Sequence, residues 1–219
     1  MPADQAQGLR RRSHLQPLHA IHCFFDAAES TVRLAQALHR RGWTSLLVDT
    51  RARVFADSPA RSLFDWRQQI ARGQLHTLPM PYGNGWHAPG LRGDESALTR
   101  VAQEYDCLLI DAGDASDWAP LPGAAQAVVI EANATQASML QGYALLKTLS
   151  SLGGGISVGL LGDVAGCARL QAASGQFLDP AFCQVLYSVA GEVDAFAALA
   201  VRMTSEETGR TARYKTGNT

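Results

Sequence analysis

The chain has 219 residues, of which 47% are hydrophobic and 18% charged, and its 19 basic and 20 acidic residues nearly cancel. This size predicts one globular domain of α/β size, or at most two small ones, and the near-zero charge argues against a surface devoted to nucleic acid or anionic membrane. No apolar run reaches the ~18 residues that a membrane-spanning helix needs. The basic start is not followed by the apolar stretch of a signal peptide, so we expect a cytoplasmic protein with reduced, mostly buried cysteines.

Residues 1–16 are polar and basic, and residues 206–219 hold almost no large apolar side chain, so both ends are predicted to be disordered in isolation. Apolar runs and 3.6-residue periodicity predict the elements between them. In chain order these are a strand at 20–25, a helix at 29–41, strands at 45–48 and 75–78 on either side of a helix at 62–72, a helix at 96–104, strands at 107–110 and 127–130, a helix at 136–152, a strand at 156–161, a helix at 165–173, a strand at 185–189 and a helix at 193–203. Residues 79–89 are rich in proline and glycine and are predicted to be an ordered loop. Its Tyr82 and Trp86 either form an exposed contact or pack within the loop itself.

Strands that lack clean alternation and are separated by helices indicate a mostly parallel sheet with both faces covered. We therefore expect an α/β domain over 17–205, with three layers and a doubly wound sheet. In such sheets ligands bind beyond the carboxyl ends of the strands. The segments to search are 24–31, 49–53, 111–117, 131–136 and 162–166.

The turn between the first predicted strand and helix lies where a phosphate-binding loop lies in nucleotide-binding α/β proteins. Its residues are Phe24, Phe25, Asp26, Ala27, Ala28, Glu29, Ser30 and Thr31. Two later strands end on Asp49 and Asp111. This order resembles the MinD/ParA family of P-loop ATPases, whose loop typically reads K-G-G-V-G-K-S-T and whose acidic residues occupy the positions of Asp49 and Asp111. The resemblance implies the P-loop NTPase fold.

The residues that differ from the family pattern are those that would bind a nucleotide. Glycines let backbone N–H groups wrap around phosphates, and here Phe25, Asp26 and Ala28 replace them. Glu29 stands at the lysine position, where a carboxylate ~4 Å from a phosphate oxygen costs about 4 kcal/mol at an effective dielectric constant of 20. The second acidic position of the family falls on Arg51, and its adenine-binding asparagine falls on Gly162. We therefore expect a pseudo-ATPase that binds neither ATP nor magnesium.

The residues that do match the family pattern can also be explained by structural roles. Ser30 or Thr31 can cap the helix that begins there, and Asp111 can cap the turn that follows its strand. None of the six histidines has a spacing that indicates a metal site.

The N-terminus carries a second motif. Five positions read D-Q-A-x-x-L-R, formed by Asp4, Gln5, Ala6, Leu9 and Arg10. This pattern resembles the activator segment of FlhG, a MinD-like family that regulates flagellar number, and segments 126–130, 133–138 and 143–147 also resemble that family. In FlhG the segment forms a short helix on FlhF, a signal-recognition-type GTPase, and stimulates GTP hydrolysis.

The resemblance implies an FlhF-like GTPase as partner, with other flagellar assembly or transcription factors as further partners. Residues 4–12 can form only about two helical turns, and so short a helix is marginal in water without a partner. Gln5 is a donor and acceptor of the kind that orients an attacking water, and Arg10 can form an ion pair or neutralise phosphate charge.

In the MinD/ParA family ATP drives dimerisation and membrane attachment, so loss of the loop predicts a monomer with weak or absent membrane contact. An apolar stripe near the C-terminus is expected to pack on the sheet rather than on lipid, since it lacks a basic polar face. Its residues are Val193, Phe196, Ala197, Ala200, Val201 and Met203. Two alternatives stay open: an active MinD/ParA-type ATPase that cycles on the membrane, and a MinD-like scaffold of another secretion or pilus system.

Overall fold

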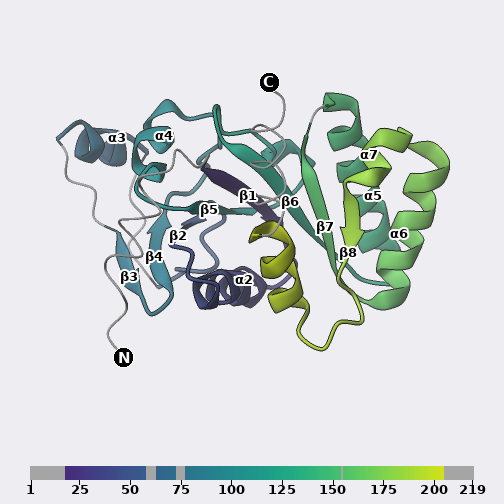
Figure 1. Cartoon of the computed structure of the whole chain (residues 1–219). Helices are drawn as coiled ribbons and strands as arrows, with labels where there is room; N and C mark the ends of the chain where they lie inside the picture. The colour runs from purple at the N-terminus through teal and green to yellow at the C-terminus, as the bar shows by residue number, and fades with distance from the viewer. Residues whose placement is uncertain (1–17, 58–62, 73–76, 154, 205–219) are drawn as a thin grey trace, which may run out of the picture.

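The fold is an eight-stranded, mostly parallel sheet with helices on both faces (Figure 1). The computed structural model describes residues 18–57, 63–72, 77–153 and 155–204. The strands are ordered β3-β4-β2-β5-β1-β6-β7-β8, and only the β3–β4 pair is antiparallel. They span β1 His19–Phe24, β2 Ser45–Asp49, β3 Leu78–Met80, β4 Gly83–His87, β5 Cys107–Ala112, β6 Ala125–Ala132, β7 Ser157–Gly162 and β8 Leu186–Ser188. The helices are α2 Ala28–Arg40, α3 Leu63–Ala71, α4 Ser96–Ala102, the 3₁₀ helix η1 Ala115–Asp117, α5 Gln136–Leu152, α6 Val164–Phe177 and α7 Pro180–Gln184, and residues 195–204 are also helical.

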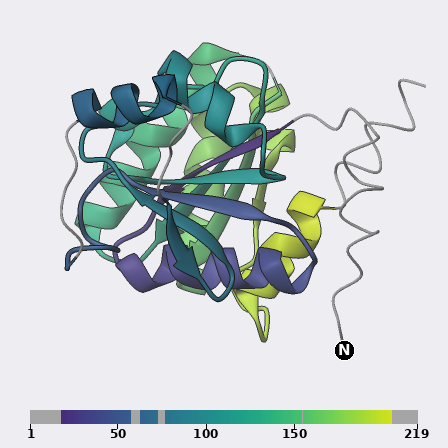
Figure 2. The same cartoon turned by 90° about the vertical axis from the view of Figure 1, so that its left-hand side faces the viewer.

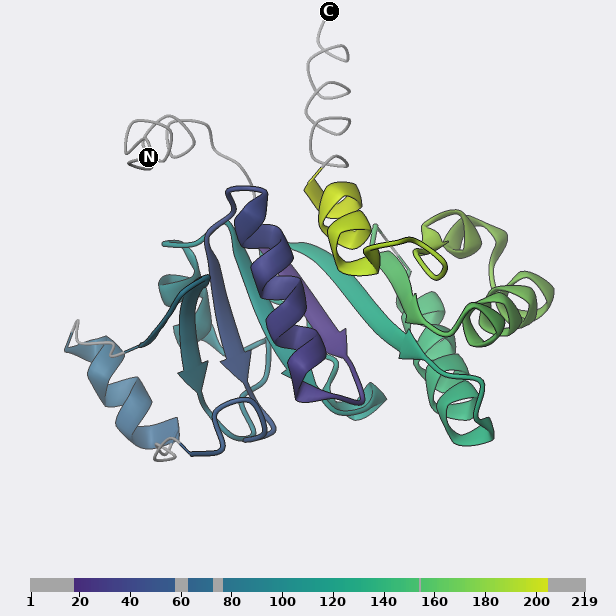
Figure 3. The ribbon, with the colours of Figure 1, turned by 90° about the horizontal axis from the view of Figure 1, so that it is seen from below.

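The helices form two layers around the sheet. Helix α2 and the helix at 195–204 cover one face, and helices α3 to α6 cover the other (Figures 2 and 3). Along β1, Ile21 and Cys23 pack in the cluster on the α2 face, whereas Ala20 and Phe24 pack on the opposite face. A strand buried on both faces has no polar side to alternate with, which is why the predicted strands are short continuous apolar runs. The predicted α/β class and mostly parallel sheet are confirmed.

Helix α5 shows how local sequence sets the ends of an element. Thr135 lies at its N-cap and accepts a hydrogen bond from the Ser138 amide at 3.3 Å. Gly153 follows the last turn with a φ of 66°, a conformation that glycine adopts without the strain imposed by a Cβ. The observed bounds, Gln136–Leu152, are those predicted from the sequence.

The helix at 195–204 packs partly as its stripe predicts. Phe196, Ala200 and Met203 are buried in the core on the α2 face. Val193 and Val201 are exposed, so the prediction was wrong for these two residues. The described part of the chain contains no helix long and apolar enough to cross a membrane.

The structure corrects the predicted loop at 79–89. This segment forms most of the β3–β4 hairpin, and β4 pairs in parallel with β2. Tyr82 and Trp86 are buried, so of the two alternatives for these residues the exposed contact was wrong. Gly85, which suggested a loop, is needed in the strand because a Cβ there would clash with the Phe55 ring.

Other differences concern short elements at the sheet edges. Of the strand predicted at 75–78, only Leu78 lies in β3, and residues 75 and 76 lie outside the described ranges. Helix α7 was not predicted, although Asp179 caps it and Pro180 begins it. The sheet ends in strands of three residues on both sides, β3 and β8, and β3 contains Pro79.

Candidate functional site

The topology places a switch point between β1 and β5. Strand β1 connects through α2 to β2 on one side of this pair, whereas β5 connects through η1 to β6 on the other side. Such a reversal of direction separates the loops beyond the strand ends, and ligands of open α/β sheets bind there. Asp111 lies at this point, paired in register with Cys23 of β1.

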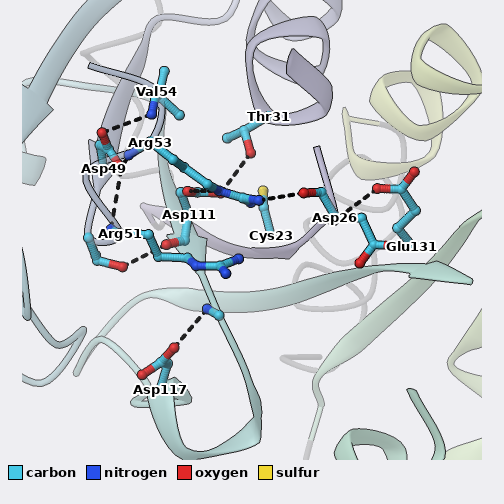
Figure 4. A network of polar contacts seen from close by, with 12 residues as sticks. Cys23, Asp26, Thr31, Asp49, Arg51, Arg53, Val54, Asp111, Asp117 and Glu131 are labelled. Atoms are coloured by element: carbon cyan, nitrogen blue, oxygen red, sulfur yellow. Dashed lines mark hydrogen bonds and ion pairs between the residues drawn. The ribbon is translucent and has the colours of Figure 1, made fainter. Parts of the chain in front are cut away.

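The carboxylate of Asp111 is hydrogen-bonded by other side chains of the same chain (Figure 4). Arg53 grips its carboxylate with two hydrogen bonds, from Nε to Oδ2 and from Nη2 to Oδ1, both at 2.6 Å. Thr31 Oγ1 donates a further bond to Oδ1 at 3.0 Å. The Asp111 side chain has no exposed surface and that of Arg53 is 18% exposed. The two short bonds from Arg53 make the pair a charge-assisted clamp, and they also raise the pKa of Arg53 above its ordinary value.

The loop after β2 holds Arg53 in position beside Asp111. Asp49 Oδ1 accepts bonds from the amides of Arg51 and Arg53, and Oδ2 accepts bonds from the amides of Val54 and Phe55. The amides enclose the carboxylate as a backbone nest encloses an anion. Ala52 adopts a φ of 58° within this loop, and it is the only non-glycine residue with positive φ in the described ranges.

The left-handed conformation of Ala52 costs roughly 1–2 kcal/mol, which the bonds to Asp49 offset. His87 of β4 also lies against Asp49, with Nδ1 at 3.3 Å from Oδ2. Asp49 therefore acts as an anchor for the loop, whose nest binds a carboxylate of the chain rather than a phosphate.

The turn between β1 and α2 differs from a phosphate-binding loop in the way it is held. Phe24 and Phe25 are buried on opposite faces of the sheet, and the Phe25 ring lies 6.4 Å from that of Phe196. Their rings anchor the turn at positions where the family pattern has lysine and glycine. None of the residues of this turn has positive φ, so its backbone does not form the nest that wraps a phosphate.

The predicted helix cap is wrong. The N-cap of α2 is Ala27, whose side chain makes no cap bond, and α2 itself begins at Ala28. Ser30 and Thr31 are both buried within the helix. Asp111 caps no turn, because its carboxylate is taken by Thr31 and Arg53.

Asp26 is tied to the end of β6 and to Arg53. Its amide donates to Glu131 Oε2 at 2.9 Å, its Oδ2 accepts from Asn133 Nδ2 at 2.8 Å, and its carbonyl accepts from Arg53 Nη1 at 2.8 Å. Arg53 therefore joins the segments that follow β1 and β2 to the end of strand β5 that carries Asp111 (Figure 4).

Beside this site an open groove of about 530 Å³ runs along the ends of β6 and β7. It is lined by Glu131, Glu192 and Asp194 and by one arginine, Arg33, which lies over the Phe196 ring at 4.2 Å. Glu29 is exposed nearby on the first turn of α2. Carboxylates on this side repel the phosphates of a nucleotide.

Position 162 also differs from the position that carries the adenine-binding asparagine in the family pattern. It ends β7 with a φ of 118°, and a Cβ at this position would lie 2.7 Å from the Ala132 carbonyl oxygen. An asparagine side chain, which the family resemblance places here, would therefore clash with the backbone of β6.

The structure brings together the predicted residues Asp26, Thr31, Asp49 and Asp111 at one edge of the sheet. The predicted activator residues lie outside the described ranges; they are Asp4, Gln5, Ala6, Leu9 and Arg10. Sequence reasoning missed Arg53, the residue that fills the site. The available signal was its position in segment 49–53, which follows a predicted strand. Arg51 lies in the same segment, however, and spacing alone does not show which of the two arginines enters the site.

No model of a known protein family matches the chain, and no curated protein has a matching sequence. Within the described residues, no group of three or more His, Cys, Asp or Glu side chains is arranged to hold a metal ion. The class that the fold itself defines is an α/β protein with an eight-stranded, mostly parallel sheet.

Proposed function

We propose that the protein is a regulatory pseudo-ATPase that resembles FlhG and stimulates GTP hydrolysis by an FlhF-type GTPase without binding ATP. The observation that carries the pseudo-ATPase part is the clamp of Arg53 on Asp111. In the MinD/ParA resemblance, Asp111 supports the magnesium-bound water. Here a guanidinium of the chain neutralises that carboxylate, so the site needs no cation from solution.

Three further features support the same proposal. The turn before α2 has a backbone that does not wrap a phosphate, Glu29 stands at the lysine position, and the groove beyond β6 and β7 is lined by carboxylates. A site already closed by its own side chains gives the domain one conformation that does not depend on nucleotide. We therefore propose a mostly monomeric cytoplasmic protein that its partner recruits to the cell pole or the flagellar base.

The activating role is carried by the N-terminal motif. Gln5 would orient the attacking water in the partner's GTPase site, and Arg10 would pair with a partner carboxylate or offset phosphate charge. A neutral amide suits the first role because it donates to and accepts from water at the same time. Ala6 and Leu9 would supply the apolar contact of the short helix.

The experiment is GTP turnover by an FlhF-type GTPase from the same cell, without ATP. Full-length protein is expected to stimulate turnover, and a chain that lacks residues 1–16 and the variant Gln5→Ala are expected to lose the stimulation. Gln7→Ala is the matched control, because Gln7 occupies an unconstrained position of the motif and should retain it. Addition of ATP and magnesium should change nothing.

Absence of stimulation by the full-length protein would refute the proposal and favour the scaffold alternative. Stimulation that appears only with ATP would favour the active ATPase.

A further inference from the structure

A small cavity of about 170 Å³ lies on the other side of the β1–α2 turn, between the ends of β1, β5 and β6 and helix α5. Its apolar part is formed by Phe24, Ile130 and Leu145, which belong to the core between the sheet and α5. Pockets for drug-sized ligands have volumes of roughly 300–1,000 Å³, so this cavity suits a molecule about the size of one amino acid.

Negatively charged side chains outnumber positively charged ones in the lining of the cavity. Three carboxylates line it, those of Asp26, Asp114 and Glu131, and Arg51 is its single cation. None of the ion pairs found among the described residues involves Arg51. The Arg51 side chain lies against Gly113 in the cavity wall. Hydrogen bonds from Ser116 lower the pKa of the Asp114 carboxyl, and the charge of Arg51 adds a smaller contribution in the same direction.

The carboxylates are positioned by hydrogen bonds. Glu131 uses Oε2 to accept the Asp26 amide, and Asp26 uses Oδ2 to accept from Asn133. Asp114 uses Oδ1 to accept from Ser116. The second carboxylate oxygen of Asp26 and that of Glu131 make no hydrogen bond of those found within the described ranges, so each can accept from a bound cation.

Two neutral groups of α5 complete the lining. Ser138 Oγ accepts the Asn133 amide and keeps its own proton to donate, and Gln141 Nε2 donates to the Gly113 carbonyl at 3.3 Å, which leaves its side-chain oxygen as an acceptor.

We propose that this cavity binds a basic amino acid, a molecule with two ammonium groups and one carboxylate. The carboxylate pairs with Arg51, and the ammonium groups are held by the carboxylates of Asp26, Glu131 and Asp114. A ligand without positive charge would displace water from those carboxylates without replacing its contacts, and a diamine would place a cation near Arg51 with no anion between them. This site borders the Arg53 clamp, since Asp26 contacts both and Arg51 lies on the same loop, but it does not depend on the GTPase partner.

Calorimetric titration of the full-length protein tests the proposal with three matched ligands. Lysine carries all three groups, 1,5-diaminopentane lacks the carboxylate, and 6-aminohexanoate lacks the α-ammonium group. Lysine is expected to bind at least about tenfold more tightly than either of the others, since each loses a charge-assisted interaction.

Arg51→Gln is the decisive variant. It removes the cation while its backbone amide can still bond to Asp49, so the loop is retained. Lysine affinity should fall at least about tenfold, and affinity for 1,5-diaminopentane should stay or rise, because repulsion from Arg51 is gone. Asp26→Asn should weaken both ligands, and the control Arg100→Gln, an exposed arginine of α4, should change neither.

Failure of lysine to saturate the protein by about 10 mM would overturn the proposal. Equal losses of affinity for lysine and for 1,5-diaminopentane in Arg51→Gln would also overturn it, because the guanidinium would then not bind the ligand carboxylate. Neither result bears on GTPase stimulation, which is measured without these ligands.

Discussion

Replacement of Arg53 by methionine tests whether the clamp stabilises the fold. Methionine keeps much of the length of the side chain but removes the charge and all three hydrogen bonds, two to Asp111 and one to the Asp26 carbonyl. The Asp111 carboxylate has no exposed surface, and of the partners found in the described part of the chain it would then keep only the Thr31 hydroxyl. Removal of one partner of a buried pair typically costs about 3–5 kcal/mol, because a charge is left buried and uncompensated.

The measurement is the free energy of unfolding from urea titration, together with the thermal midpoint. For a chain of this size each kcal/mol lowers the midpoint by roughly 2–4 °C, so Arg53→Met should lower it by roughly 6–20 °C. The double variant Arg53→Met with Asp111→Asn removes both charges, and it should be more stable than Arg53→Met alone. A single variant within about 1 kcal/mol of the wild-type protein would refute the claim that the clamp is a buried, fixed ion pair.

Two further predictions concern single side chains in the core. Thr31→Val keeps the shape of the side chain but removes the hydroxyl that donates to Asp111, so it should lower the free energy of unfolding by about 1–3 kcal/mol in urea titration, and Ser30→Ala should lower it less. Burial lowers the pKa of His22 from 6.5 to about 4, so the unfolded chain takes up the proton first as the pH falls. Stability from His22 is therefore present above pH 6.5 and should decline by about 3 kcal/mol between pH 6.5 and 4, measured as unfolding free energy against pH. His22→Gln should flatten this decline, and an unchanged slope would contradict the assignment to His22.

The sequence predicted best those elements whose local signals agree with their packing. Helix α5 has a threonine cap, a long apolar stripe and a terminal glycine, and its predicted bounds are the observed ones. Strands β1 and β5 are short apolar runs because both of their faces are covered. Asp49 and Asp111 were placed at the ligand edge of the sheet because the carboxyl ends of parallel strands meet there.

Prediction failed where tertiary contacts override local preference. Strand β4 contains Gly83 and Gly85, which weaken a strand in isolation, but Gly85 makes room for the Phe55 ring against β2. The role of Arg53 depends on the shape of its loop. That shape comes from four hydrogen bonds that backbone amides donate to Asp49 and from the left-handed conformation of Ala52. No periodicity or spacing in the sequence encodes that loop.

The three-residue strands at the two margins of the sheet govern how the protein can associate. A long, open margin is a template on which another chain can add a strand, and natural sheets avoid this with short margins and proline. Here β3 offers three residues, one of them Pro79, which has no N–H to donate, and β8 offers three residues at the other margin. Strand addition at either margin would therefore gain few backbone bonds. Association through the described domain is expected to use its helices and loops, so a surplus of this protein should resist polymerising into sheets.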